Sequence, residues 1–313
     1  VAIQYKDENS LNSPDVRADF KAWFQAARPN FPNAILFTNQ IPFDATDVHL
    51  AAYMSESKPD MLCMDSYRWK IGNTEGTWNL LSDMQRYRKW GLRGNDGTGS
   101  RPIPYALYPQ TFRGENMWRD PSDSEMRLNH FGAWAFGYTF TSDFTFNYGS
   151  SSLFSPGCDT TKPTALYTQL KEINRQGRNL GPALVRLLSK DVRFIAGESK
   201  DASGKTVTNR NPIDIPNWQF GVNDPYLRGW EITNPGKRNN GLKGDVLLSW
   251  FRVLDESFDG PAKDEIYIMV TNALVAPDGS AADCRQRICL NFLFNNSKIN
   301  AVQRLSRETG RVE

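Results

Sequence analysis

The sequence predicts an α/β protein in which a parallel sheet covered by helices is followed by an antiparallel β domain. Two observations carry this prediction. Before about residue 188, short apolar runs alternate with helical segments, and after it short alternating runs are separated by clusters of Gly, Pro, Asn and Asp. Continuous apolar runs are typical of buried parallel strands. Alternating runs between turn residues are typical of antiparallel strands.

The expected parallel strands share one design, in which an apolar run ends in polar or aromatic residues and leads into a helix. They are expected near residues 1–5, 34–38, 61–65, 103–108 and 139–148. Strand-helix alternation implies a parallel sheet covered by helices, and in a barrel of this kind the chemistry lies where strands end. A complete eight-stranded barrel needs three more strands and about 250 residues. Because the first of these strands resembles the fourth strand of a barrel, the five units are expected to be strands four to eight of a (β/α)8 TIM barrel.

Capping signals mark the expected helices. Ser13-Pro14 and Thr46 are helix starts, and Ser122 with Glu125 forms a capping box. A helix is also expected at 77–90, and a long one at 166–188 that Gly181-Pro182 kinks or breaks. The later strands are expected at residues 192–196, 229–233, 246–254, 265–271 and 287–294. We therefore expect residues 1–188 to form a barrel half and residues 189–313 a small antiparallel β-sandwich.

Composition excludes several classes of function. The 313 residues are 39% apolar and carry a net charge of +2 without a dense Lys/Arg run, which argues against nucleic-acid binding. No apolar stretch is long enough to span a bilayer. The four cysteines show no metal-ligand spacing, two histidines are too few for a His-rich site, and no phosphate or dinucleotide motif is present. No metal and no cofactor are therefore expected.

The chain begins at Val1 within a strand pattern and without an initiating Met. We interpret it as a processed or truncated piece, whose first strand is expected to be covered by a missing N-terminal barrel half or by another chain. A targeting signal would lie in the missing flank, and the expected location is secreted or otherwise extracytoplasmic.

Three motifs at the expected strand ends carry a resemblance. Tyr5-Lys6-Asp7-Glu8-Asn9 is similar to the Asp-Glu-Pro or Asn-Glu-Pro end of strand four in retaining glycosidases, with Asn9 where Pro often follows. The segment from Pro59-Asp60 to Asp65-Ser66-Tyr67 is similar to the end of strand six, and Gln110 to Glu125 to the segment after strand seven. The chain resembles the second half of the TIM-barrel glycoside hydrolases that carry an appended β-sandwich.

This resemblance implies that Glu8 is the general acid/base of a glycosidase. Glycoside cleavage needs two carboxyls, about 5–5.5 Å apart in retaining enzymes and about 6.5–9.5 Å apart in inverting ones. Retaining members of the group place a Glu at the end of strand seven, where this chain has Gln110. The second carboxyl is therefore Asp65 or Glu115, and the stereochemical outcome stays open.

Residues near the same strand ends are candidates for holding the sugar. Asp7 is expected to position substrate or an arginine, and Asn39 and Gln110 to bond to sugar hydroxyls. Aromatic faces pack on the apolar face of a pyranose, and the candidates for this role are Tyr67, Trp69 and Trp118.

The leading hypothesis is a glycoside hydrolase that acts on an oligo- or polysaccharide. Gln110 in the nucleophile position motivates an alternative, a non-catalytic carbohydrate-binding barrel, and a third reading is a structural β-domain protein with a vestigial barrel half. A second carboxyl facing Glu8 favours catalysis, whereas amides and aromatics alone favour binding.

Overall fold

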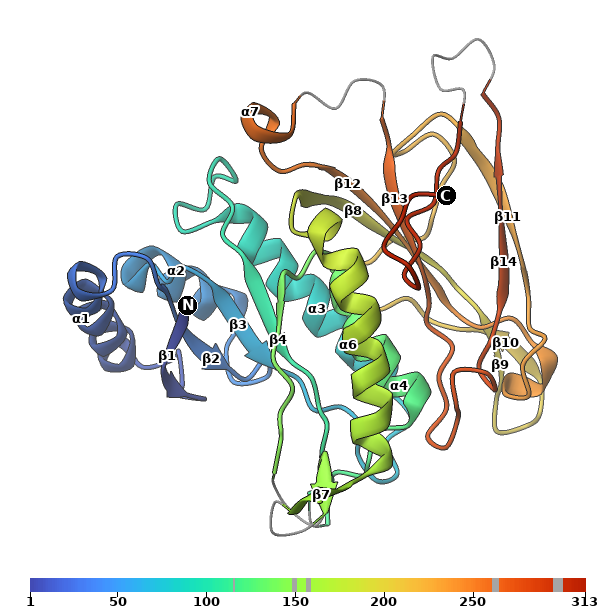
Figure 1. Ribbon diagram of the computed structural model, residues 1–313, viewed down its shortest axis with the longest axis horizontal. Coiled ribbons are helices and arrows are strands. Elements are labelled where there is room, and N and C mark those ends of the chain that lie inside the picture. Colours follow the sequence, from blue (N-terminus) through green and yellow to red (C-terminus); the bar gives the residue numbers. More distant parts are fainter. Residues whose placement is uncertain (115, 148–150, 156–158, 261–264, 295–300) are drawn as a thin grey trace.

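The first half of the chain forms a five-stranded parallel sheet whose strands follow one another in chain order (Figure 1). The structure is a computed structural model that describes residues 1–114, 116–147, 151–155, 159–260, 265–294 and 301–313. The five strands are β1 (Ala2–Asp7), β2 (Ile35–Gln40), β3 (Leu62–Asp65), β4 (Tyr105–Tyr108) and β5 (Phe140–Thr141). All five lie where the sequence predicts strands, although β5 is shorter than expected. Closure into a barrel stays a prediction.

The two faces of this sheet bury different side chains, as the alternation along a strand requires. Leu36, Leu62, Met64 and Leu107 belong to the large core under the helices. A smaller cluster lines the opposite face, and its members are Phe37, Met61, Cys63 and Ala106, with Tyr108 and Phe140 packed against them. Polar residues that continue this second face at the strand ends therefore point away from the helices.

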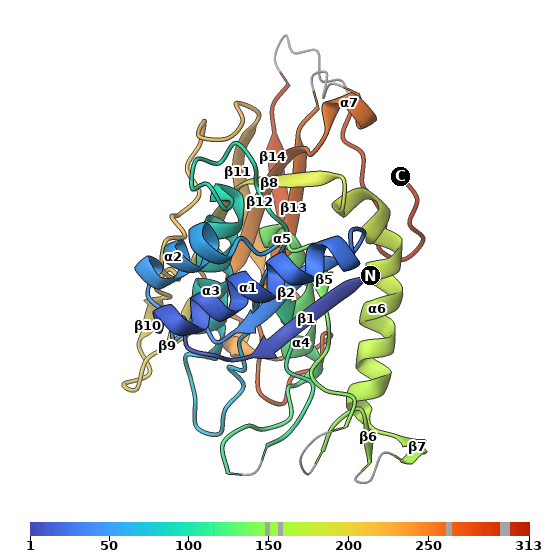
Figure 2. The same cartoon turned by 90° about the vertical axis from the view of Figure 1, so that its left-hand side faces the viewer.

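Helices α1 (Pro14–Asn30), α2 (Asp47–Ser57) and α3 (Gly76–Arg93) cover the first face of the sheet (Figure 2). Two of the predicted starts are confirmed, because the Ser13 and Thr46 side chains accept bonds from Val16 and His49 amides. The Ser122–Glu125 capping box is also confirmed, at the start of α4 (Asp123–Arg127). A π-helix, η1 (Leu128–Gly132), follows α4 and leads into α5 (Ala133–Phe136).

Between the sheet and the second half of the chain lie one short hairpin and one long helix. The hairpin joins β6 (Phe154–Ser155) to β7 (Asp159–Pro163), and α6 spans Ala165–Leu184 with Pro182 inside its last turn. The C-terminal segment returns to α6, where Arg175 pairs with Glu308 and the Asn179 amide bonds to the carbonyls of Arg307 and Glu308. None of the helices in the described part of the chain has the length and apolar character of a membrane span.

The second half of the chain is antiparallel. One sheet has the order β13-β12-β8, a second pairs β11 with β14, and β9 with β10 forms a hairpin. The elements are β8 (Leu187–Ile195), β9 (Glu198–Lys200), β10 (Thr206–Thr208), β11 (Leu227–Thr233), η2 (Asn239–Gly241), β12 (Val246–Val253), α7 (Glu256–Asp259), β13 (Tyr267–Asn272) and β14 (Arg287–Phe292). Ile195 and Trp250 of the first sheet and Ile232 of the second share one core cluster, so these two sheets face each other.

The two halves also share a core, although the sequence predicts separate domains that meet at residue 188. Val192, Phe194 and Leu247 of the β region belong to the same cluster as the side chains under the parallel sheet. Buried Arg88 of α3 donates to Ser189 Oγ at 2.8 Å. The β region is therefore packed directly against the helical layer.

One edge of the parallel sheet is formed by β1, which pairs with β2 and, among the described residues, with no other strand. An uncovered edge presents backbone groups that another strand can pair with. We propose that further strands cover this edge, supplied either by an additional barrel segment or by another chain. In isolation the 313-residue protein is expected to self-associate, with a light-scattering mass above 35.5 kDa that rises with concentration.

A charge on the edge should suppress this association. Ala2→Lys changes an exposed residue of β1, and Ala26→Lys changes an exposed residue of α1 as the matched control. We expect only the first change to lower the measured mass. A protein that stays monomeric at every concentration would show that the β1 edge needs no cover.

Candidate functional site

A cavity of about 510 Å³ opens at the carboxyl ends of β1 and β3. This size lies in the range of roughly 300–1,000 Å³ that is usual for small-ligand sites. Its lining combines three carboxyls, two cations and a group of aromatic and apolar side chains. The lining residues are Asp7, Glu8, Ile41, Pro42, Phe43, Asp65, Ser66, Tyr67, Arg68, Lys70, Phe112, Met117, Trp118 and Phe144.

A bulge at the end of β1 positions the first two carboxyls. The register slips by one residue between Gln4 and Asp7, and Lys6 adopts the left-handed conformation with φ 56°. An extra residue of this kind redirects the side chains that follow it. Asp7 consequently pairs with Asn39 of β2, and the Glu8 amide donates to the Asn39 carbonyl at 3.1 Å.

Asn39 joins the carboxyls of two different strands. It follows Phe37 by two residues on β2, and Asp65 follows Cys63 by two residues on β3, so both continue the face that is turned away from the helices. The Asn39 side-chain amide donates to Asp7 Oδ1 at 2.9 Å and to Asp65 Oδ1 at 3.1 Å. Asp7 also accepts from Gln4 at 3.1 Å.

Glu8 and Asp65 both line this cavity and their carboxyl groups interact, and we call the two residues the dyad. Asp65 is 4% exposed, whereas Glu8 is exposed. Burial raises the pKa of Asp65 to about 8, and the hydrogen bond and charge of Glu8 act in the same direction, against the lowering effect of the Asn39 amide. Two carboxylates in contact cannot both ionise readily. Asp65 therefore keeps its proton at neutral pH.

Aromatic side chains form one wall of the cavity. The Tyr67 ring stacks on Phe144 at a centroid distance of 5.7 Å and meets Phe112 and Trp118 edge-on at 5.1 and 6.5 Å. Burial raises the pKa of Tyr67, followed by the charges of Asp65 and Glu8, so its hydroxyl stays protonated beside the dyad. The wall can therefore offer aromatic surface to a ligand, and the Tyr67 hydroxyl can donate a hydrogen bond.

A buried histidine supports this wall from behind. His130 of the π-helix lies with Nε2 2.9 Å from Asp143 Oδ1, next to Phe144. Burial lowers the pKa of His130, but the charge and hydrogen bond of Asp143 outweigh it and leave the pKa raised overall. The pair ties the segment after β5 to the helical layer.

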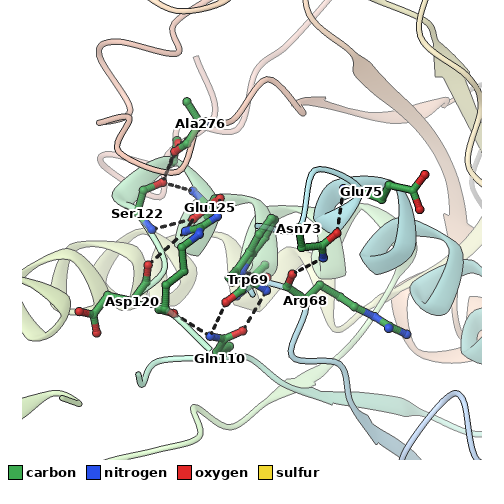
Figure 3. A network of polar contacts seen from close by, with 12 residues as sticks. Arg68, Trp69, Asn73, Glu75, Gln110, Asp120, Ser122, Glu125 and Ala276 are labelled. Carbon is green, nitrogen blue, oxygen red and sulfur yellow. Dashed lines mark hydrogen bonds and ion pairs between the residues drawn. The ribbon is translucent and has the colours of Figure 1, made fainter. Parts of the chain in front are cut away.

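Two predicted sugar-binding residues lie outside the cavity. Trp69 is 2% exposed, packs in the main core and donates through its indole to Asn129 at 3.2 Å. Gln110 is fully buried, and Figure 3 shows its amide directed at the backbone of Trp69. Gln110 accepts from the Trp69 amide at 3.1 Å and donates to the carbonyls of Trp69, Phe112 and Arg119 at 3.3, 3.2 and 3.0 Å.

These contacts give Gln110 a structural role in this conformation, because all its bonding groups serve the backbone of two loops. Gln110 and Trp69 therefore do not line the cavity, and their predicted contact with sugar stays a prediction. Nearby, Arg119 forms a two-pronged pair with Glu125 at 2.5 and 2.6 Å, and Ser122 bonds to Ala276 at 2.7 Å (Figure 3). The loops that carry the wall are thereby anchored to the β region.

Most of the other predicted site residues lie at the cavity. Glu8, Asp65, Asp7, Tyr67 and Trp118 line the cavity, Asn39 holds two of the carboxyls, and Glu115 lies outside the described residues.

Sequence reasoning missed some lining residues. Phe112, Phe144 and Lys70 contribute to the cavity without having been singled out as site residues. Lys70 and Phe112 lie in segments that follow expected strands, and Phe144 lies within the expected strand 139–148. In the described ranges, no group of three or more His, Cys, Asp or Glu residues is arranged to hold a metal ion.

Comparisons with known proteins add little to this geometry. No protein-family model matches the chain, and no curated protein does. One similar solved structure is a beta-galactosidase from the psychrophilic Marinomonas ef1, with 15% identity and a TM-score of 0.38. The match covers 55% of this chain and only 29% of that chain. A likeness at this level carries no argument about fold or activity.

The raised pKa of Asp65 predicts a pH-dependent stability. The folded protein keeps this proton to about pH 8, whereas an unfolded Asp releases it near pH ~3.9. The free energy of unfolding should therefore fall as the pH rises from about 4 to about 8, by on the order of a few kcal/mol. Urea unfolding at pH 5 and pH 8 measures this, and Asp65→Asn should remove most of the difference.

Asp15→Asn, at an exposed position of α1, is the matched control and should leave the pH dependence unchanged. A wild-type minus Asp65→Asn difference that does not vary between these two pH values would mean that Asp65 is already ionised in the folded protein.

The bonds of Gln110 predict a large loss of stability on substitution. Gln110→Leu leaves three carbonyls and one amide without the bonds that Gln110 makes, and each unsatisfied buried group costs roughly 1–3 kcal/mol. We expect the free energy of unfolding to fall by at least about 3 kcal/mol in urea titrations. Gln25→Leu, on the exposed face of α1, should change it by less than about 0.5 kcal/mol. Similar small effects for both would mean that other contacts hold the two loops.

Proposed function

We propose that this protein is a glycoside hydrolase that cleaves O-glycosidic bonds in an oligo- or polysaccharide. The single observation that carries the proposal is the contact between Glu8 and Asp65 at an aromatic-walled cavity of about 510 Å³. Paired carboxyls in different environments can divide the roles of acid and base or nucleophile. The aromatic wall supplies the apolar surface on which a sugar ring can pack.

The environments of the two carboxyls suggest their roles. Asp65 is buried and has a pKa of about 8, so it is the natural proton donor to the departing glycosidic oxygen. Glu8 is exposed at the cavity and is left to attack the sugar or to activate water. This division reverses the assignment that the sequence motif favours, in which Glu8 is the acid.

Bound substrate must set the separation of the two dyad carboxyls. Retaining enzymes hold them about 5–5.5 Å apart and inverting ones about 6.5–9.5 Å apart. Glu8 is exposed and follows a bulge, so it is the partner that can move, while Asn39 holds Asp65. The separation reached with substrate bound then decides the stereochemical outcome.

A second candidate function is non-catalytic carbohydrate binding. It is favoured by Gln110, because the end of β4 carries an amide whose groups all serve the backbone and no carboxylate nucleophile. Glycoside hydrolysis releases a product, whereas non-catalytic binding does not. A protein that binds glycans without releasing product would support the second candidate.

Glu8→Gln is the decisive substitution. It should lower hydrolysis of aryl glycosides and oligosaccharides by about 10²–10⁴-fold while the fold persists, because it removes one member of the dyad. In the wild type, kcat/KM should also fall as the pH rises through about 8, where Asp65 loses its proton. Asn39→Ala should move that fall to higher pH, because the Asn39 amide lowers the pKa of Asp65.

Glu75→Gln is the matched control for Glu8→Gln, since Glu75 is an exposed acid of another cavity. Undiminished hydrolysis by the Glu8→Gln variant would remove Glu8 from the mechanism. Absence of turnover in the wild type, with glycan binding retained, would leave the non-catalytic alternative.

A further inference from the structure

The cavity contains cations as well as carboxyls. Arg68 and Lys70 line it together with Asp7, Glu8 and Asp65. Both belong to the loop that follows β3, where the Lys70 amide donates to the Arg68 carbonyl at 3.0 Å. Hydrolysis of a neutral glycoside by the dyad requires neither cation, so their presence calls for a separate explanation.

The charge of Arg68 is balanced within the protein. Its guanidinium donates through Nε and Nη2 to Asp83 Oδ2 at 2.8 and 2.5 Å, and through Nε to Ser66 at 3.0 Å. Both partners of this ion pair are largely buried, with side-chain exposures of 18% and 14%. Arg68 therefore contributes little net charge to the cavity.

The charge of Lys70 is not balanced in the same way. Within the described ranges no carboxylate lies within ion-pairing distance of its ammonium group, and Asp120 in the facing loop is paired with Arg113 at 3.4 Å. The ammonium instead lies 5.8 Å from the ring centroid of Trp118. A cation–π contact orients a cation without neutralising it.

The backbone holds Lys70 and Trp118 in this arrangement. The two residues form an antiparallel bridge, and the Ile71 amide donates to the Met117 carbonyl at 2.9 Å. The loops after β3 and β4 are thereby joined beside the cavity. The bridge consequently fixes the backbone from which the Lys70 side chain reaches the Trp118 ring.

We propose that the cavity selects an acidic carbohydrate, one whose carboxylate or sulfate group pairs with the ammonium of Lys70 while a sugar ring packs on the aromatic wall. This proposal rests on the carbohydrate function proposed for the same cavity. A neutral sugar that enters would strip water from Lys70 without supplying a counter-charge, which is unfavourable. An acidic sugar replaces the lost water with a charge-assisted bond.

The three carboxyls of the site do not pair with the Lys70 ammonium, so they leave it available to an acidic sugar. Asp65 is buried and interacts with Glu8, and Asp7 is bonded to the amides of Gln4 and Asn39. Lys70 forms no ion pair with any of these three among the contacts described. The acidic substituent is therefore expected beside Trp118, with the scissile bond at the dyad.

Binding measurements on the 313-residue protein test the proposal separately from turnover. Three oligosaccharides of equal length and linkage serve as probes: a neutral glucose oligomer, its 6-carboxylate (glucuronic acid) form and its 6-sulfate form. Calorimetry with the Glu8→Gln variant avoids hydrolysis during the titration. We expect at least one acidic form to bind about ten-fold or more tightly than the neutral form, and the preference to weaken with added salt.

Substitutions then assign the preference to Lys70. Lys70→Gln should remove most of it, Lys70→Arg should retain it, and Lys21→Gln, at an exposed position of α1, should leave it unchanged. The carboxylate and sulfate arms show which acidic group is preferred. Circular dichroism of each variant establishes that it is folded, and Lys70→Met, which also removes the charge, carries the comparison if Lys70→Gln unfolds.

Equal or tighter binding of the neutral oligomer, or a preference that survives in folded Lys70→Gln, would overturn the proposal. Binding and hydrolysis of the neutral oligomer alone would leave the glycosidase function standing and remove only the acidic selection. Failure of all three oligomers to bind, with no hydrolysis of any glycoside, would remove both.

Discussion

The candidate site depends on one amide, the side chain of Asn39. Parallel pairing brings the ends of β1, β2 and β3 to the same edge of the sheet, and Asn39 on the middle strand donates to acids of both neighbours, Asp7 and Asp65. An amide with two donor hydrogens can serve two acceptors at once. Without it, three carboxyl groups would lie close together with less to offset their repulsion.

The dyad follows from this arrangement. Because Asn39 fixes Asp65 on a buried face, Asp65 is protonated more readily than an exposed acid, and Glu8 on the exposed bulge supplies the partner. The bulge is essential, since a regular β1 would put alternate side chains at this edge. One inserted residue thus changes which acid of the Asp7-Glu8 pair faces Asp65.

The wall of the cavity depends on a different support. Gln110 bonds to the backbone of the loops that carry Tyr67, Phe112 and Trp118, and Ser122 connects the same region to Ala276 in the β region. The β region therefore contributes to the site by bracing these loops and by sharing the core under α3. Its removal would expose apolar surface on α3 as well as release the loops.

Much of the local structure follows from the sequence alone. Apolar runs locate all five parallel strands, and Ser13, Thr46 and Ser122 mark helix starts because each hydroxyl can cap the amides of the first turn. The strand-end position of Glu8, Asp65 and Tyr67 also brings them to one cavity, because parallel strands end at a common edge.

Only the tertiary structure decides burial and pairing at that edge. Trp69 and Trp118 both follow strands and look alike in the sequence, yet one is in the core and the other lines the cavity. Gln110 follows a strand and looks like a site residue in the sequence, but neighbouring loops take up its bonds. The pKa of Asp65 likewise depends on Glu8, which is 57 positions away along the chain. Such contacts join residues that are distant in sequence, so no local pattern encodes them.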